Sequence, residues 1–313
     1  MSTSNSIAFG PAGKVGSAVA RRAQELGAKV SLAMRDPEKP IPGLTTDQEH
    51  EGGFERVLAD LNEPETIQAA VSKTGAKRAF IYIVYGSPDN MRSSIASLKS
   101  AGIEYVVFLS SEGITGDLRS VPQSEFIAWV HAQVEINLEE IFGVGGFVAV
   151  RPGFFASNSL WWKKMIASDS RVKIAYPEAK LDWISPEDIG RVCGALLAGG
   201  PQAVEGPEPN IIRLRGPELV TQREAVSSIA KAIGKSIKVT ELDEQEGLKM
   251  LMESNGMPEF IAKRLIDLFR SRAEDGNFFE GDKEPVRNVR KYAGKEPTRF
   301  PEWAEENKQE FSI

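Results

Sequence analysis

Residues 7–16 of the chain read IAFGPAGKVG, a short apolar run followed by glycines at positions 10, 13 and 16. The apolar run has the pattern of a buried strand, and apolar residues at helical spacing follow it from Val15 to Leu26. A glycine turn between a strand and a helix lets the backbone approach phosphate groups, and the helix N-terminus adds unpaired N–H groups and partial positive charge. The spacing G-x-x-G-x-x-G departs from the commoner dinucleotide fingerprint, but its place after the first strand predicts a diphosphate cradle. The predicted cradle consists of Gly10, Pro11, Gly13, Lys14, Val15 and Gly16.

The alternation of strand and helix continues through the first 153 residues. Apolar runs at 29–34, 56–59, 79–84, 105–109 and 147–150 predict further strands, with helical segments between them. Continuous runs of this kind are typical of parallel strands that helices cover on both faces. The predicted fold class is therefore α/β, a Rossmann-type doubly wound parallel sheet.

The character of the sequence changes after Pro152-Gly153, where helix signals dominate. We expect a nucleotide-binding domain over 1–153 and a smaller, mainly helical substrate lobe over 154–313. A strand near 210–215 is expected to return to the first sheet. The charged, proline-punctuated segment 285–313 is expected to lie along the surface.

Composition and charge narrow the function. Of the 313 residues, 41% are hydrophobic and 26% charged, as in ordinary globular proteins. One cysteine, Cys193, and two histidines disfavour an internal disulfide and a zinc site. The net charge of −6 and the scattered basic residues disfavour nucleic-acid binding. No apolar run approaches the roughly 18 residues of a membrane span, and Met1 to Ser6 lack the features of a signal peptide. We expect a cytoplasmic protein that handles a small molecule without a metal; the sequence leaves its oligomeric state open.

The end of the second predicted strand indicates which cofactor is bound. Arg35 stands at this end and Asp36 follows it. A guanidinium matches the 2′-phosphate of NADP, whereas an acidic residue at this position would bind the ribose of NAD. The position of Arg35 therefore favours NADP(H), the alternative being a solvated charge at a strand end. Asp60 and Leu61, after the third strand, are expected beside the adenine, although Asp60 could equally cap the next helix.

Together with Arg151-Pro152-Gly153-Phe154-Phe155, these motifs resemble the NmrA-like family, atypical short-chain dehydrogenases/reductases related to isoflavone reductase-like proteins. The likeness covers about residues 5–215 and includes Ser110-Ser111, Glu135 and the segment 183–190. The resemblance implies an NADP(H) site along the carboxyl ends of the strands and a variable lobe over the substrate. Beyond the cradle, the residues expected at this cofactor site are Arg35, Asp60, Leu61, Tyr85, Ser110, His131, Pro152, Gly153 and Phe154.

The resemblance also implies a proton-donating tyrosine four residues before a lysine on the helix after strand five. Counting back from Glu135 places His131 at the lysine position and Ile127 at the tyrosine position. Ile127 cannot donate a proton, while His131 can bond a ribose hydroxyl or transfer a proton. Alternatively, His131 is simply packed beside the apolar stripe of its helix. The predicted catalytic candidates are His131, Ser111 at the family's serine position, Glu112 and Tyr85.

The substrate site is expected directly after strand six. Phe155, Asn158, Trp161 and Trp162 suit a bulky, apolar ligand with one polar contact, although the rings could instead pack the lobe. The resulting hypothesis is an NADP(H)-dependent oxidoreductase acting on a specialised metabolite. A hydride acceptor that needs little acid help fits it, such as an imine, an iminium ion or an activated double bond, with possible rearrangement or cyclisation of the product. The alternative hypothesis is a non-catalytic, NADP-sensing regulatory protein.

Overall fold

The computed structural model describes residues 4–205, 210–275 and 282–312. Met1 to Thr3, part of the segment expected to lack the features of a signal peptide, lie outside the described residues. The chain forms two compact units. Unit 1 comprises 1–152, 186–214 and 288–296, and unit 2 comprises 153–185, 215–287 and 297–313. The expected continuous boundary after residue 153 therefore differs from the structure, because two later segments belong to unit 1.

Unit 1 is built on a seven-stranded sheet in the order β3-β2-β1-β4-β5-β6-β9, with every neighbouring pair parallel. This is the predicted Rossmann-type doubly wound sheet. The late strand returns to it as expected, and the structure shows that it pairs with β6. The strands are β1 (Asn5–Phe9), β2 (Lys29–Met34), β3 (Glu55–Leu58), β4 (Arg78–Tyr82), β5 (Tyr105–Leu109), β6 (Phe147–Pro152) and β9 (Ile211–Leu214).

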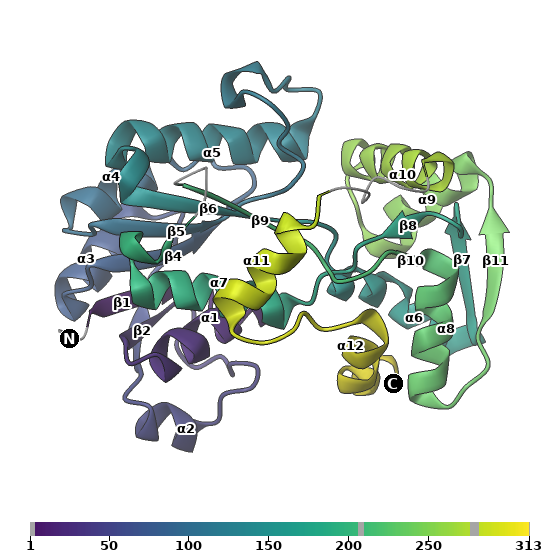
Figure 1. Cartoon of the computed structure of the whole chain (residues 1–313), viewed down its shortest axis with the longest axis horizontal. Coiled ribbons are helices and arrows are strands. Elements are labelled where there is room, and N and C mark those ends of the chain that lie inside the picture. Colours follow the sequence, from purple (N-terminus) through teal and green to yellow (C-terminus); the bar gives the residue numbers. More distant parts are fainter. Residues whose placement is uncertain (1–3, 206–209, 276–281, 313) are drawn as a thin grey trace. The chain divides into compact units, whose positions relative to one another are not determined.

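Helices cover both faces of this sheet (Figure 1). The helices α3, α4 and α5 share one apolar core with alternate residues of the strands, including Ile7, Phe9 and Phe108. The helices α1 and α7 pack closely together in the layer on the other side (Figure 1). The bounds are α1 (Lys14–Glu25), α2 (Thr46–Glu51), α3 (Pro64–Thr74), α4 (Arg92–Ser100), α5 (Phe126–Phe142) and α7 (Pro186–Gly199).

The close packing of α7 explains why segment 186–214 belongs to unit 1. A Cβ on Gly190 would lie 2.3 Å from the Cβ of Ala18, and one on Gly194 would lie 2.7 Å from the carbonyl oxygen of Val19. Only glycines allow α1 to approach this closely. Later in the chain, Asn288 donates a hydrogen bond to the carbonyl of Arg213 at 3.1 Å, which ties segment 288–296 to β9.

Unit 2 is mainly helical, as expected, but it also contains two short strand pairs that the sequence analysis missed. The strands β7 and β11 pair in parallel, and β8 and β10 pair antiparallel. The strands of unit 2 are β7 (Arg171–Ala175), β8 (Lys180–Leu181), β10 (Val220–Thr221) and β11 (Lys238–Leu242). The helices outside the first sheet layers are α6 (Lys163–Asp169), α8 (Gln222–Ile233), α9 (Glu244–Asn255), α10 (Glu259–Glu274), α11 (Glu284–Ala293) and α12 (Phe300–Glu306).

The carboxy-terminal segment is not a surface strap, which corrects the expectation for 285–313. Phe300, Trp303 and Phe311 are each at most 2% exposed and belong to the core of unit 2. The ring of Phe300 lies 4.8 Å from that of Trp183, which is also buried. The charged residues around these rings face outward, so the segment is amphipathic. Its high average polarity led to the wrong prediction that it lies along the surface.

Candidate functional site

The glycine turn after β1 requires glycine at two positions for different reasons. Gly10 has φ of 68° and donates a backbone hydrogen bond to Ala33 at the end of β2. Gly16 has ordinary dihedrals, but a Cβ there would lie 2.3 Å from the carbonyl oxygen of Gly10. The turn is therefore a backbone structure in which side chains would collide with the chain itself.

The turn leads directly into α1, whose N-cap residue is Gly13. Gly13 makes no side-chain capping hydrogen bond to the first turn of this helix. The N–H groups and the positive end of the helix dipole are thus available for an anion, as at phosphate sites of other doubly wound sheets.

The predicted cofactor-selecting residue Arg35 follows β2 and is exposed. Within the described residues its guanidinium has no ion-pair partner, while its charge acts on the phenol of Tyr82. Asp36 accepts a hydrogen bond from the backbone N–H of Glu38 at 3.0 Å, which shapes the turn after Arg35. The guanidinium of Arg35 is therefore exposed at the end of β2, whereas the carboxylate of Asp36 is hydrogen-bonded to the backbone.

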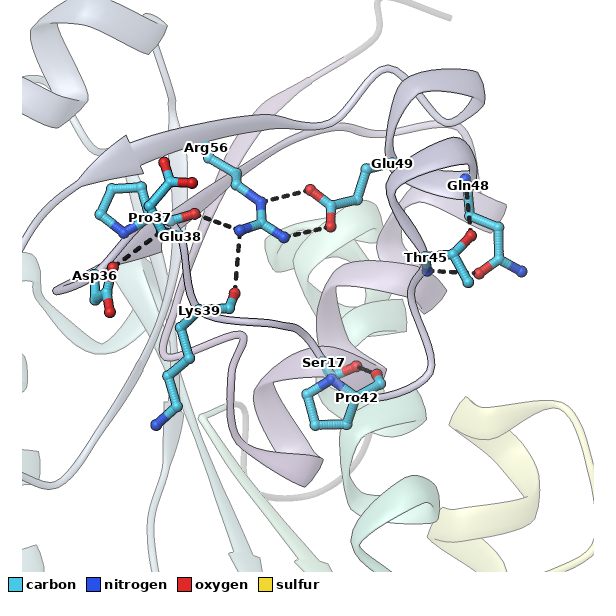
Figure 2. A network of polar contacts seen from close by, with 10 residues as sticks. All are labelled: Ser17, Asp36, Pro37, Glu38, Lys39, Pro42, Thr45, Gln48, Glu49 and Arg56. Atoms are coloured by element: carbon cyan, nitrogen blue, oxygen red, sulfur yellow. Dashed lines mark hydrogen bonds and ion pairs between the residues drawn. The ribbon is translucent and has the colours of Figure 1, made fainter.

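The segment after Arg35 is fixed by a residue that the sequence analysis missed (Figure 2). Arg56, on β3, donates to the carbonyls of Pro37 and Lys39. The same guanidinium binds both carboxylate oxygens of Glu49 on α2, each at 2.6 Å. On the far side of the segment, the hydroxyl of Ser17 donates to the carbonyl of Pro42 (Figure 2). These contacts attach the β2–β3 connection to β3 and α1, so its conformation is defined.

Tyr82, at the end of β4, packs directly on the glycine turn. A Cβ on Gly10 would lie 2.5 Å from Cε1 of its ring. Burial raises the pKa of the Tyr82 phenol, and the nearby Arg35 opposes that shift. Asp60 uses Oδ1 to accept a hydrogen bond from the backbone of Asn62 in the turn before α3. The N-cap of α3 is Glu63, so Asp60 does not cap this helix, contrary to the alternative left open for it. Leu61 is buried, and its carbonyl accepts a hydrogen bond from Ser94.

A buried charge cluster closes the carboxyl ends of β5 and β6. The Arg151 guanidinium binds Glu135 of α5 through two hydrogen bonds, of 2.9 and 2.6 Å. Ser110 donates its hydroxyl to the same carboxylate. Glu135 is 1% exposed, so the pair is shielded from solvent, and the two hydrogen bonds offset part of the cost of removing both charges from water. Ser110 is therefore engaged in structure, and its hydroxyl already has an acceptor.

The structure brings together two of the predicted catalytic candidates, His131 and Tyr85. Their ring centroids lie 6.1 Å apart with an edge-on geometry, and Tyr85 also stacks on Phe126. His131 is 4% exposed, and its Nδ1 lies 2.7 Å from the carbonyl oxygen of Ile127. Because a carbonyl only accepts, Nδ1 carries the proton, and the lone pair is on Nε2.

Burial lowers the pKa of His131 to about 4, an effect that the hydrogen bond to Ile127 partly opposes. The imidazole is consequently neutral near pH 7 and can accept a hydrogen bond but supply no imidazolium proton. The other candidates lie on the loop after β5. Ser111 accepts a hydrogen bond from the backbone of Gly113, and the backbone N–H of Glu112 donates to the carbonyl of Pro152, at the end of β6.

The predicted residues after Pro152 belong to unit 2. Gly153 lies against Asp182, where a Cβ would come within 2.3 Å of the carboxylate. Phe154 donates its backbone N–H to the same carboxylate at 3.0 Å. Its ring packs edge-on against Trp183, Trp161 and Phe269, with the nearest centroid at 5.0 Å. Asp182 is buried, which raises its pKa, and it holds two chain segments together because Gly216 also donates to it.

The four predicted substrate residues separate into two pairs. Trp161 and Trp162 line a pocket within unit 2. Phe155 forms a bridge with Ile184, and Asn158 donates its backbone N–H to Phe155 at 3.0 Å; neither lines this pocket. The sequence analysis missed Gln222, the polar residue of the pocket, because its partners lie 46 and 47 residues away in the sequence.

In the described part of the chain, no three or more His, Cys, Asp or Glu residues are grouped as a metal site would need. In the same residues, no helix combines the length and apolar character of a membrane span.

The parallel strand order, the glycine turn between β1 and α1 and the uncapped start of α1 define a Rossmann-type dinucleotide-binding fold. A family model described as the NmrA-like family matches residues 3–304, and the chain belongs to this family. The nitrogen metabolite regulation-like protein bik4 of Gibberella fujikuroi is 38% identical over 314 residues, covering 95% of this chain and 94% of that protein.

Two further similarities extend over nearly the whole chain. The NAD(P)H azoreductase of Xenophilus azovorans is 25% identical over 308 residues, covering 97% of this chain and 98% of that protein. The Escherichia coli quinone oxidoreductase QOR2, solved with NADPH, superposes with a TM-score of 0.70 at 18% identity, covering 96% of this chain and 98% of that one. At this identity the structural match supports the fold alone.

Proposed function

We propose that this protein is a cytoplasmic, NADP(H)-dependent oxidoreductase that acts on a bulky, mostly apolar small molecule of specialised metabolism. The proposed reaction is hydride transfer involving an imine, an iminium ion or an activated double bond. In one variant of the proposal, the product then rearranges or cyclises in the same site. The name of the azoreductase relative favours an enzyme of this general class.

The observation that carries the cofactor assignment is Arg35. It follows the strand whose Ala33 is bonded to the glycine turn, is exposed, and has no ion pair within the described residues. The turn and the start of α1 would hold the diphosphate, and Arg35 would bind the 2′-phosphate of NADP through charge-assisted hydrogen bonds. Asp60 and Leu61, after β3, are the proposed neighbours of the adenine.

The chemistry that NADPH supplies when bound is a hydride. The residues of this chain would orient the cofactor and exclude water from it. The Nε2 of His131 is a hydrogen-bond acceptor of fixed tautomer, suited to a ribose hydroxyl. Because His131 is neutral near pH 7, we assign it positioning rather than proton donation. Any proton would then come from Tyr85, Ser111 or Glu112, or from water. This fits a hydride acceptor that needs little general-acid catalysis.

The test of the proposal is isotopic. NADPH labelled with deuterium at C4 should transfer the label to a cyclic imine or an unsaturated carbonyl compound within a panel of such compounds. NADPH labelled with deuterium on the opposite face of C4 should leave the product unlabelled, and it serves as the control. Tight binding of NADP without oxidation of NADPH by any member of the panel would contradict hydride chemistry.

That outcome would favour the second candidate, an NADP-sensing regulator. Two observations support it: Ile127 and His131 occupy the positions where the family resemblance implies tyrosine and lysine, and a 38% identical relative bears a regulatory name. A regulator should bind NADP and NADPH with different affinities, and a second protein should bind one of the two forms preferentially.

A further inference from the structure

Tyr82 is the last residue of β4, and the proposed function gives it no role. The strand β4 is the parallel neighbour of β1, with Ala8 paired to Phe80. Two residues further along, Tyr82 and Gly10 therefore reach the carboxyl end of the sheet at the same level. The side chain of Tyr82 thus lies at the edge of the sheet where the diphosphate is proposed to bind.

The ring of Tyr82 occupies the space that a side chain at position 10 would need. A Cβ on Gly10 would lie 2.5 Å from Cε1 of the ring and 3.1 Å from Cζ. Because Cζ carries the hydroxyl, the polar end of the ring lies against the turn. Gly10 is therefore required twice, for its φ of 68° and for the room that it leaves to this ring.

The hydroxyl of Tyr82 has no hydrogen-bond partner within the described residues. The side chain is half-buried, and its hydroxyl is not sealed from solvent, in contrast to that of Tyr105. Burial raises the pKa of the Tyr82 phenol, Arg35 opposes this shift and Asp60 adds to it. The phenol is consequently protonated near pH 7 and can donate one hydrogen bond.

We propose that the Tyr82 hydroxyl donates a hydrogen bond to a diphosphate oxygen of the dinucleotide. The N-cap of α1 is a glycine, so this hydroxyl adds a side-chain donor to the backbone N–H groups of the turn. A hydrogen bond to a charged phosphate oxygen is stronger than one between neutral groups. This inference deepens the proposed function and rests on it for the presence of a dinucleotide.

The proposed role of Tyr82 differs from that of Arg35. Arg35 is assigned to the 2′-phosphate, which only NADP carries, whereas NADP and NAD share the diphosphate. The Tyr82 hydroxyl should therefore increase the affinity for both dinucleotides and leave the preference between them unchanged.

The experiment is a calorimetric titration of the full chain and of Tyr82→Phe with NADP and with NAD. The substitution removes the hydroxyl and keeps the ring against Gly10. Both affinities should fall about tenfold, and the NADP-to-NAD ratio should stay within about twofold of the wild-type ratio. Unchanged affinities would overturn the proposal. A loss confined to NADP would also overturn it, because the hydroxyl would then face the 2′-phosphate.

Tyr105→Phe is the matched control. Its hydroxyl is buried without a hydrogen-bond partner, and Tyr105 is the first residue of β5, at the amino end of the sheet. This variant should bind both dinucleotides as the wild type does. Thermal unfolding of the ligand-free proteins tests a purely structural role: Tyr82→Phe should keep the wild-type Tm. A lowered Tm together with the loss of affinity would show that the hydroxyl supports the fold, and would overturn the proposed contact.

The same samples separate this inference from the proposed function. Normal dinucleotide binding by both the wild type and Tyr82→Phe would reject the Tyr82 contact alone. The expected loss in Tyr82→Phe, in a protein that binds NADP but transfers no hydride, would reject the oxidoreductase and leave the contact intact. A wild type that binds neither dinucleotide would reject both.

Discussion

The glycine turn of unit 1 is formed by backbone atoms, whereas the Gln222 pocket of unit 2 is formed by side chains. The turn occupies seven consecutive residues, and its geometry is set by the φ of Gly10 and by the approach of Gly16 to a carbonyl. The pocket gathers side chains spread over positions 161–269, and one of them, Gln222, is oriented by two backbone carbonyls. A site formed by the backbone of consecutive residues can be predicted from a local sequence motif. A site formed by side chains that are distant in sequence can be identified only in the folded structure.

The largest expected effect is a dependence of the free energy of unfolding on pH, which a residue of unit 1 should cause and the pocket of unit 2 should not. His131 in unit 1 has a folded-state pKa lowered to about 4, while no lining residue of the pocket is titratable. The unfolded chain binds a proton near pH 6.5 before the folded chain does, so His131 should reduce the free energy of unfolding by about 3 kcal/mol between pH 6.5 and 4. Urea unfolding of the wild type and of His131→Gln should show a smaller acid loss in the variant. Equal losses would show that His131 is not buried and neutral.

The next effect tests the backbone nature of the turn. Gly16→Ala places a Cβ against the carbonyl of Gly10, so the turn must open, and NADP affinity should fall about 100-fold. Gly145→Ala, where a Cβ meets nothing within 4 Å, is the matched control and should leave the affinity unchanged. Calorimetric titration measures both. An NADP affinity in Gly16→Ala equal to that of the wild type would contradict the backbone nature of the turn.

Arg35→Ala tests the one side chain near the glycine turn to which we assign a role in cofactor selection. The loss of charge-assisted hydrogen bonds should weaken NADP about 30-fold and NAD hardly at all. Lys29→Ala, at the beginning of the same strand, removes an exposed charge from the other end of β2 and controls for net charge. If both cofactors weakened equally, Arg35 would have no part in recognising the 2′-phosphate.

The smallest effect concerns the attachment of the Arg35 segment. Arg56→Gln removes the bonds to Glu49 and to the carbonyls of Pro37 and Lys39, so the NADP-to-NAD affinity ratio should fall about fivefold. Arg56→Lys should not restore the ratio, because an ammonium cannot make the bidentate contact. Arg119→Gln, an exposed change in the same unit, should retain the wild-type ratio. A purely structural role would lower thermal stability and leave the ratio intact.

These cases show how much of the molecule was predictable. Periodicity predicted the sheet strands, and the glycine spacing predicted the turn, because both depend on neighbouring residues. Arg56 was missed because its acceptors are backbone carbonyls 17 and 19 residues away, which no local pattern reveals. His131 was found by its position on the helix, but its neutral state follows from burial and from the bond to Ile127, which only the fold defines.

The boundaries of the units were the least predictable feature. Residues 186–214 follow the first lobe segment in sequence but pack on α1 through Gly190 and Gly194. Small residues suit close helix packing, yet their partner helix lies over 160 residues earlier. In segment 297–313, three buried aromatic residues were hidden among charges that face solvent.

The most direct measurement is a calorimetric titration of the purified, ligand-free chain with NADP and with NAD. The glycine turn and Arg35 together predict saturable binding of NADP that is at least about tenfold tighter than binding of NAD. Saturation by NAD at equal or greater affinity, or no heat of binding with either dinucleotide, would contradict the account.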